Sequence, residues 1–370
     1  MNKLISAAGV LLMTTSVGHA AGLDRSGQSV SAIFKSGTYG ELSFGQVTPS
    51  VTGVGPNAIP PTDVAPTGNV APAYNQIGFG FKTDVNDQLS FGMIMDQPFG
   101  ASVDYSTAGY ALTGVNANVE SSGLTVLARY KLNDAFSIHA GVRQVTVSGD
   151  VFTLVPAWGA YSATFGEDSG TGYVIGAAYE KPEIALRLAV TYSSAIDVSM
   201  PTTDVRVIPG APPTVVPFAP SDTDVTLPQS VNVDFQTGIA ANTLLMASIR
   251  WVDWTETVIA PTNYPGGNLL DYDNDGMTYS IGVGRRFSDK LSASVTYGWE
   301  NASGGLASNL SPTDGYKSLQ VGAAYTLTDG VELSGGVRYV VIGDATTELT
   351  SASFTDNSAV GVGMKLSFNF

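Results

Sequence analysis

The chain has 370 residues, no cysteine and a net charge of −15. The negative charge argues against nucleic acid as a partner, and without cysteine the protein cannot be stabilised by disulfides. Only 13% of its residues are charged, against roughly 25% in typical soluble domains, so the composition argues against an ordinary soluble fold. No segment beyond the N-terminus is apolar over the about 20 residues that a transmembrane helix needs.

The first twenty residues have the pattern of a secretory signal peptide. Lys3 supplies a positive start, and residues 4–17 are apolar or small and uncharged. Gly18 and Ala20 are small residues at the two positions that a signal peptidase recognises. The apolar run is shorter than the about 20 residues of a membrane anchor. We therefore expect residues 1–20 to be a signal peptide that is cleaved after Ala20.

Residues 21–38 are polar, small and weakly patterned, and they do not have the alternation of a strand. Two interpretations are open. The segment is either a plug inside the β-barrel that the following residues are expected to form, or a disordered periplasmic tail. The composition alone does not favour one over the other.

From residue 39 to the C-terminus, apolar and polar residues alternate with the period of two that is typical of strands. The last strand is the clearest example. One face carries Val360, Val362, Met364, Leu366, Phe368 and Phe370. The other carries Gly361, Gly363, Lys365, Ser367 and Asn369. An apolar terminal strand that ends in an aromatic residue resembles the signal that outer-membrane proteins present to their assembly machinery, so we expect Phe370 to bind that machinery.

The same alternation predicts fourteen strands, at residues 39–54, 74–82, 88–96, 118–131, 135–148, 171–180, 184–199, 229–237, 243–259, 275–287, 290–301, 316–327, 330–342 and 358–370. Short connections alternate with long ones, such as 97–117, 149–170 and 200–228. Short periplasmic turns and long external loops are typical of outer-membrane barrels, and a spanning sheet must close because lipid offers edge strands no partner. We therefore predict an all-β fold: a 14-stranded antiparallel barrel over residues 39–370, multi-pass in the outer membrane.

Several segments resemble the FadL family of outer-membrane transporters for long-chain fatty acids and other hydrophobic compounds, hydrocarbons among them. They are VNDQLSFG (85–92) followed by QPFG (97–100), YKLNDAFS (130–137), and LPQSV (227–231) leading to WVDW (251–254). The resemblance covers nearly the whole chain after the signal peptide. It implies a plugged barrel that is closed to water, with substrate leaving sideways through a gap at a kink in the third strand. The family usually has a longer plug with an Asn-Pro-Ala stretch, which residues 21–38 lack.

Pro98 and Gly100 lie where the resemblance places the kink. Proline removes a hydrogen-bond donor from the ladder, and glycine weakens and bends a strand, so both would open a lateral seam. The alternative is an ordinary turn that leads from the third strand into its loop. Phe99, between them, is expected to contact substrate.

Four arginines fall on faces that are predicted to line the lumen: Arg143, Arg187, Arg250 and Arg338. An arginine can hold a carboxylate through two parallel hydrogen bonds, so these residues are candidates for binding a fatty-acid headgroup. Acidic residues are predicted on the same faces: Asp234, Glu300 and Glu332. They leave open the alternative that the arginines form internal ion pairs that hold the strands together.

The sequence has no motif typical of an enzyme or of a metal site. Residues 271–276 imitate the start of a calcium loop, but Gly282 stands where the loop needs a glutamate. His139 is the only histidine after the signal peptide and has no carboxylate near it in the sequence, which argues against an outer-membrane phospholipase. We therefore expect no catalysis, no cofactor and no metal.

The sequence thus predicts outer-membrane transport of hydrophobic molecules, either long-chain fatty acids or hydrocarbons, by passive diffusion through a plugged barrel with lateral release into the membrane. The alternatives are a general porin for small polar solutes and a structural or adhesin barrel. The external residues 205–218 are unusually apolar and rich in proline, which favours a hydrophobic substrate. The expected partners are that substrate, outer-membrane lipid and lipopolysaccharide.

Overall fold

The computed structural model describes residues 23–57 and 63–370. The signal peptide predicted for residues 1–20, and the first two residues of the segment 21–38, lie outside the described residues. Within the described part, no helix is long and apolar enough to cross a bilayer. The helices there are three short 3-10 turns: η1 (Ser31–Phe34), η2 (Pro182–Ile184) and η3 (Trp254–Glu256).

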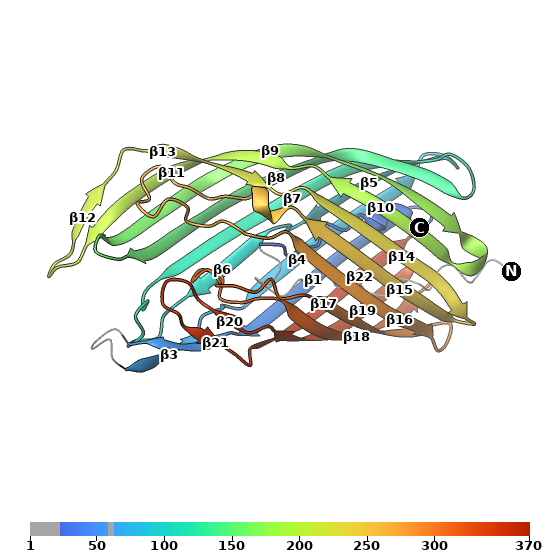
Figure 1. The fold of residues 1–370 in the computed structure, drawn as a ribbon. Helices are drawn as coiled ribbons and strands as arrows, with labels where there is room; N and C mark the ends of the chain where they lie inside the picture. Colours follow the sequence, from blue (N-terminus) through green and yellow to red (C-terminus); the bar gives the residue numbers. More distant parts are fainter. Residues whose placement is uncertain (1–22, 58–62) are drawn as a thin grey trace.

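The described residues form a closed antiparallel barrel of fourteen strands (Figure 1). β1 (Tyr39–Ser50) pairs with β4 (Tyr74–Asp84) on one side and with the last strand, β22 (Ser358–Asn369), on the other, which closes the sheet. The strands between them are β5 (Leu89–Asp96) continued by β6 (Gly100–Asp104), β7 (Asn116–Lys131), β8 (Phe136–Val155), β9 (Gly159–Lys181), β10 (Leu186–Ser193) continued by β11 (Ile196–Ile208), β13 (Ser221–Leu227) continued by β14 (Ser230–Ala240), β15 (Thr243–Val252), β16 (Gly276–Arg286), β17 (Leu291–Glu300), β18 (Tyr316–Thr328) and β19 (Val331–Ile342). The barrel predicted from the sequence is confirmed.

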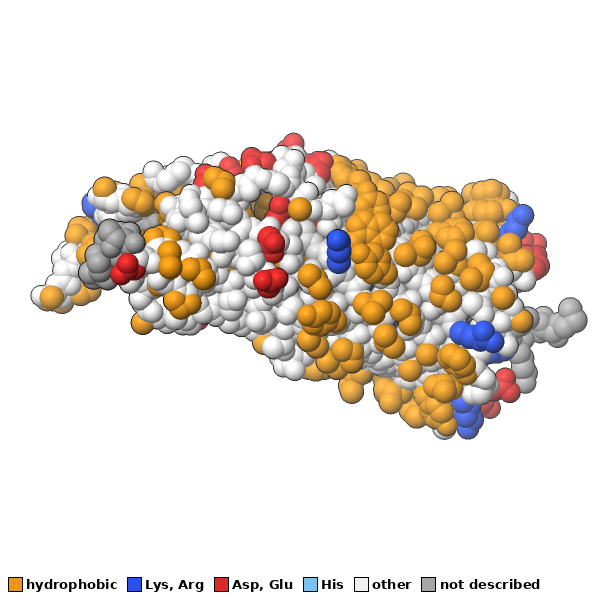
Figure 2. Space-filling model, turned by 60° about the horizontal axis from the view of Figure 1, so that its bottom comes forward, with side chains coloured by type: hydrophobic (Ala, Val, Ile, Leu, Met, Phe, Trp, Pro, Cys, Tyr) orange, Lys and Arg blue, Asp and Glu red, His pale blue; other side chains and the backbone are white. Residues whose placement is uncertain are grey.

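The barrel wall is apolar outside and polar inside, the reverse of a soluble protein. On β18, Leu319 and Val321 are 50% and 53% exposed and face outward, whereas Ser318 and Gln320 are buried and face the lumen. The outward apolar side chains form a broad band on the half of the barrel that carries the C-terminus (Figure 2). A surface of this kind is the one that a bilayer covers.

The two ends of the barrel differ in the length of their connections. The short turns, such as residues 132–135 and 329–330, lie at the end that carries the C-terminus, and the long connections lie at the other end (Figure 1). Short turns mark the periplasmic end of outer-membrane barrels, so the long connections are external.

Two segments that were expected to be long loops are mainly strand. β8 and β9 extend beyond the apolar band and stay paired as far as Val155 and Gly159, so residues 149–170 form a hairpin with a short tip. Residues 200–228 contribute parts of β11 and β13 and the small strand β12 (Thr214–Pro217). Their glycines, prolines and acidic residues are typical of loops, but strand pairing satisfies their backbone groups above the membrane.

A second sheet of four strands lies at the external end: β2 (Thr52–Pro56), β3 (Val64–Asn69), β20 (Ala345–Thr346) and β21 (Ser353–Phe354). It shares an apolar core with the barrel, in which Tyr105, Tyr110 and Phe354 are fully buried. A separate apolar cluster, which includes Phe99 and Trp254, packs elsewhere between the strands and the external connections. That second cluster surrounds the candidate site.

Candidate functional site

An ion pair fixes the start of the N-terminal segment, residues 23–38, to the inner face of the wall. Arg250 on β15 donates to the two carboxylate oxygens of Asp24 at 2.6 and 3.2 Å. The two side chains are only 9% and 3% exposed. Arg250 also donates to Ser230 and Asn232 on β14, so two neighbouring strands orient the guanidinium toward the segment.

Further polar contacts join the same segment to other strands. Arg143 on β8 donates to the side chain of Gln28, and Ser26 donates to Asp96 on β5 at 2.5 Å. Because β5, β8 and β15 belong to different parts of the barrel circumference, these contacts hold the segment across the lumen.

The ring of Phe34, at the end of η1, lies between two arginines. The guanidinium carbons of Arg129 on β7 and Arg187 on β10 each lie 4.8 Å from the centroid of the ring, and the ring of His139 meets it edge-on at 5.5 Å. Arg129 also forms an ion pair with Glu180. Cation–π contacts are worth about 0.5–2 kcal/mol each, so Phe34 is a second anchor of the segment.

The third wall strand is interrupted between Asp96, where β5 ends, and Gly100, where β6 begins. Both β5 and β6 pair with β7. On the other side, the pairing of β4 with β5 stops before Gln97, and the amide of Ile77 donates instead to Oε1 of Gln97 at 3.0 Å. The ladder between the second and third strands is therefore replaced by a side-chain bond beside Pro98.

Residues 23–25 cover this break from the inside. Gly100 donates its amide to the carbonyl of Leu23 at 2.8 Å, and Arg25 donates its amide to the carbonyl of Pro98 at 2.9 Å. The guanidinium of Arg25 lies 4.2 Å from the centroid of Tyr74. It occupies space that a side chain at Gly100 would need, since a Cβ there would lie 2.6 Å from Cζ of Arg25.

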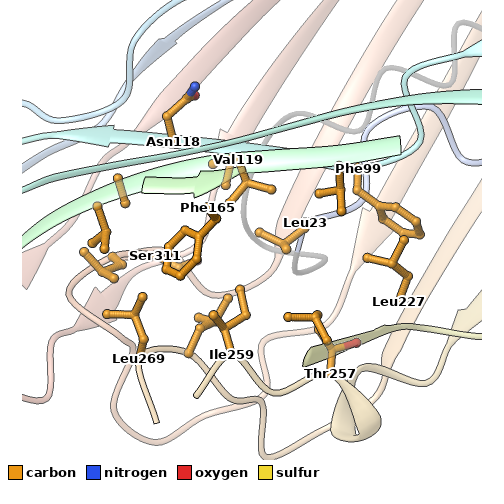
Figure 3. Close-up of a pocket in the computed structure, with 18 of the residues that line it drawn as sticks. Leu23, Phe99, Asn118, Val119, Phe165, Leu227, Thr257, Ile259, Leu269 and Ser311 are labelled. Atoms are coloured by element: carbon orange, nitrogen blue, oxygen red, sulfur yellow. The ribbon is translucent and has the colours of Figure 1, made fainter. Parts of the chain in front are cut away.

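An apolar cavity begins at Leu23 and Phe99 and extends toward the external connections (Figure 3). The space between its lining residues is about 910 Å³, including the part that is open to solvent. Its apolar lining comes from the N-terminal segment, the break between β5 and β6, strands β6 to β9, β11 and β13, and the connections that follow β13, β15 and β17. The apolar lining residues are Leu23, Phe99, Ala101, Val103, Ala117, Val119, Val147, Val151, Phe165, Met200, Val225, Leu227, Pro228, Trp254, Ile259, Leu269, Leu270, Tyr272 and Leu310. Figure 3 shows Phe165 and Leu23 between the strands and the connection that carries Ile259.

The described lining of the cavity includes no basic side chain, and its charged member is Asp150. The amide of Asn118 points away from the cavity (Figure 3). The hydroxyl of Tyr272, in the external connection, is buried without a hydrogen-bond partner among the described residues, and burial raises the pKa of this phenol. The cavity thus offers an apolar and poorly hydrated surface.

Residues 57–370 match the model of a family described as outer membrane protein transport protein (OMPP1/FadL/TodX). The chain belongs to this family. Three solved structures share its fold: a FadL homologue from Pseudomonas aeruginosa (13% identity, TM-score 0.73, 92% of each chain covered), the toluene transporter TodX from Pseudomonas putida (14%, 0.68, 95% of this chain and 96% of that one) and the toluene transporter TbuX from Ralstonia pickettii (15%, 0.64, 97% of each chain). Comparison with curated proteins finds no match. The resemblance to the FadL family and the outer-membrane location predicted from the sequence are confirmed.

In this FadL-family barrel, the predicted residues of the third strand lie beside the cavity and the break. Phe99 lines the cavity, and its ring meets that of Trp254 edge-on at 6.0 Å. Pro98 and Gly100 lie at the break between β5 and β6. The residues predicted from the sequence for the third strand thus lie together at the break and the cavity, and their role in transport stays a prediction.

None of the four predicted arginines belongs to the described lining of the cavity. Arg143 and Arg250 hold the N-terminal segment, and Arg187 packs on the ring at the end of η1. Arg338 donates to Ser318 at 2.9 Å. The sequence left two alternatives for these arginines, a site for a fatty-acid headgroup and internal ion pairs. Arg250 forms an internal ion pair, with Asp24.

Sequence reasoning missed most of the cavity lining. Leu23 belongs to a segment without a pattern, Phe165 to a predicted loop, and Ile259 to the end of a predicted strand. The available signal was the presence of large apolar residues inside stretches that otherwise resemble solvent-exposed loops, as at Leu269 and Leu270. Such residues need a buried environment, but their sequence does not say which residues provide it.

Proposed function

We propose that this FadL-family barrel takes up uncharged hydrophobic molecules, such as hydrocarbons, by passive diffusion and passes them into the outer membrane. The observation that carries the proposal is the apolar cavity, whose described lining has aliphatic and aromatic side chains and no cation. Burial in such a cavity is favourable by about 25 cal/mol for each Å² of apolar ligand surface. A hydrocarbon therefore gains affinity there without needing a polar partner.

An ionised fatty acid fits the same cavity poorly. Burying a charge without a partner costs far more than leaving it in water, and the four predicted arginines make other contacts in the lumen. Of the two substrate classes expected from the sequence, the cavity therefore favours hydrocarbons.

The structural relatives support a hydrophobic substrate. TodX and TbuX are toluene transporters, and a further relative, CymD, is a monoaromatic hydrocarbon channel (12% identity, TM-score 0.64). A porin for polar solutes needs an open and charged constriction, and an adhesin needs no cavity. Neither alternative accounts for the apolar lining.

Ligands that share a tail and differ in their headgroup test the substrate class. We expect hexadecan-1-ol to bind the purified barrel at least about tenfold more tightly than hexadecanoate at pH 8, which corresponds to about 1.4 kcal/mol. The change in tryptophan fluorescence on binding measures both affinities, because Trp254 lines the cavity. Equal or tighter binding of hexadecanoate would contradict the proposal.

The break beside Pro98 is the proposed exit into the bilayer. Each methylene is worth about 0.8 kcal/mol in apolar surroundings, so a sixteen-carbon chain gains on the order of 10 kcal/mol by staying in protein or lipid rather than entering the periplasm. Sideways release needs an opening in the wall, and the third strand has an interrupted ladder at Gln97.

Replacing Pro98 by Val and Gly100 by Thr tests this exit. Both residues favour strands, and the new side chain at position 100 also displaces Arg25 from the space beside it. We expect cells with the double variant to take up less labelled hydrocarbon at equal surface expression. The control is Pro201→Val, at a strand proline on β11. Undiminished uptake by the double variant would place the exit elsewhere.

We further propose that residues 21–38 act as a plug. Contacts of Asp24, Gln28 and Phe34 with the wall support this role. Deleting residues 21–38 is expected to raise the ion conductance of the barrel in planar bilayers. Deleting residues 209–213, at the external tip between β11 and β12, is the control. If the plug deletion conducts no better than the full-length protein, the segment does not block the lumen.

The family is one of transport proteins, and we propose that this member has no enzymatic activity. We also propose that outer-membrane lipid and lipopolysaccharide surround the apolar band. The C-terminal Phe370 is 84% exposed and is therefore available to the assembly machinery, the partner expected from the sequence.

A further inference from the structure

Two exposed cations lie on the outward wall, close to opposite borders of the apolar band. Lys317 is the first outward-facing residue of β18, and Arg285 is the last outward-facing residue of β16. Neither has an ion-pair partner within residues 23–57 and 63–370. Their strands run through the same part of the wall, but the two residues face different leaflets of the membrane.

Lys317 lies at the external border of the band. The outward residues of β18 continue from Lys317 through Leu319 and Val321 to Leu327. At about 3.3 Å per residue and a strand tilt of about 40°, the ten residues from Lys317 to Leu327 span about 25 Å, the height of the apolar band of outer-membrane barrels. The ammonium group is therefore at the level of the headgroups of the outer leaflet.

Stacked aromatic rings flank Lys317 on the same outer surface. Lys317 is in register with Trp299 on β17, which is in register with Tyr279 on β16. The ring of Trp299 stacks on Tyr279 at 5.1 Å and on Tyr297 at 5.7 Å. Tryptophan and tyrosine are typical of the headgroup region. A flat aromatic surface also suits the apolar face of a sugar ring, so this platform fits a glycolipid headgroup.

The charge around this border is otherwise negative. The neighbouring external connections carry Asp314 and Asp344. The other basic side chain on the described external surface, Arg206, donates to the carbonyl of Trp158. On the face in Figure 2, basic side chains gather mainly at the periplasmic end of the band. Within residues 23–57 and 63–370, Lys317 is therefore the cation that can attract an anionic headgroup to the external border.

We propose that Lys317 and the aromatic platform beside it, formed by Trp299, Tyr279 and Tyr297, bind a phosphorylated glycolipid of the outer leaflet, the lipid A part of lipopolysaccharide. The ammonium group pairs with a sugar phosphate, and the sugar ring packs against Trp299. The acyl chains then lie along the outward apolar side chains of β18, such as Leu319 and Val321. An annular lipid site of this kind is separate from the cavity and from the transported substrate.

The test measures binding of purified rough-type lipopolysaccharide to the full-length barrel in phospholipid nanodiscs. A lysine near a charged lipid surface is worth about 1 kcal/mol, so Lys317→Gln should weaken binding about fivefold. Lys317→Arg should retain it, and Arg285→Gln is the matched control, because it also removes an exposed outward cation, but near the opposite border. Resistance of the folded barrel to SDS at room temperature shows that each variant is intact.

Two lipids distinguish the chemistry that Lys317 recognises. Dephosphorylated lipid A should bind the unchanged protein about as weakly as intact lipopolysaccharide binds Lys317→Gln. Phosphatidylglycerol, which has a phosphate but no sugar, should show no dependence on Trp299. The proposal is overturned if Lys317→Gln binds lipopolysaccharide as tightly as the unchanged protein, if Arg285→Gln weakens binding as much, or if Trp299→Leu weakens both lipids equally.

Discussion

Replacing Arg250 by methionine should release the N-terminal segment from the wall. The substitution removes two hydrogen bonds to Asp24, whose side chain is 3% exposed. Removing one member of a buried ion pair costs about 3–5 kcal/mol, because the other charge stays buried. The equilibrium between the seated and the released segment should therefore shift by about two to four powers of ten. The contacts of Gln28 and Phe34 remain and oppose complete release.

Cysteine accessibility measures this shift directly. The chain has no cysteine, so a single Ser29→Cys substitution provides a label site without background. A hydrophilic maleimide should modify this position much faster when Arg250 is methionine, and planar-bilayer conductance should rise. Adding Asp24→Asn removes the charge that Arg250 balances in the unchanged protein and should restore part of the protection. Equal labelling rates with arginine and methionine at position 250 would refute the reasoning.

Three further variants test the wall, the second anchor and the cavity. Val321→Arg, near the middle of the outward face of β18, should lower the free energy of unfolding in lipid vesicles by about 2–4 kcal/mol. Leu327→Arg, near the border of the apolar band, should lower it by about 1 kcal/mol or less. Equal losses would contradict the depth in the membrane that we assign to these two residues. Phe34→Ala should lose up to two cation–π contacts of about 0.5–2 kcal/mol each and speed labelling of Ser29→Cys. Unchanged labelling would mean that Phe34 does not anchor the N-terminal segment. Phe165→Asp should weaken hexadecan-1-ol binding at least about tenfold, since it buries a charge in the cavity, and an unchanged affinity would exclude the cavity as the binding site.

The wall was predictable because its signals are local. Each strand alternates with a period of two, and turn residues such as Asn133 and Asp134 follow directly in the chain, so the strand order needs no long-range information. Prediction was wrong where the barrel extends above the membrane. In residues 149–170, Gly149 and Gly166 are typical of a loop, yet pairing between β8 and β9 makes the segment a hairpin.

The candidate site was less predictable because its contacts join distant parts of the chain. The sequence placed Arg250 on the inner face of a strand, but its partner Asp24 lies 226 positions away in a segment without a pattern. The cavity likewise combines Leu23 with strand residues and with Ile259 from an external connection. Alternation shows which way a side chain faces, and it does not show what meets it in the lumen.

The hydrogen bond from the amide of Ile77 to Oε1 of Gln97 affects how fast this contact in the wall can break. A backbone carbonyl in a ladder moves only when its strand moves, and collective motions of that kind take microseconds to milliseconds. A glutamine side chain rotates about single bonds, and exposed side chains change rotamer within picoseconds to nanoseconds. This contact in the wall can therefore break by one rotamer change while the pairing of β5 and β6 with β7 stays intact. Residues 23–25 still cover the break from the inside. Opening of the proposed exit is therefore limited by the movement of residues 23–25 and not by a rearrangement of the barrel strands.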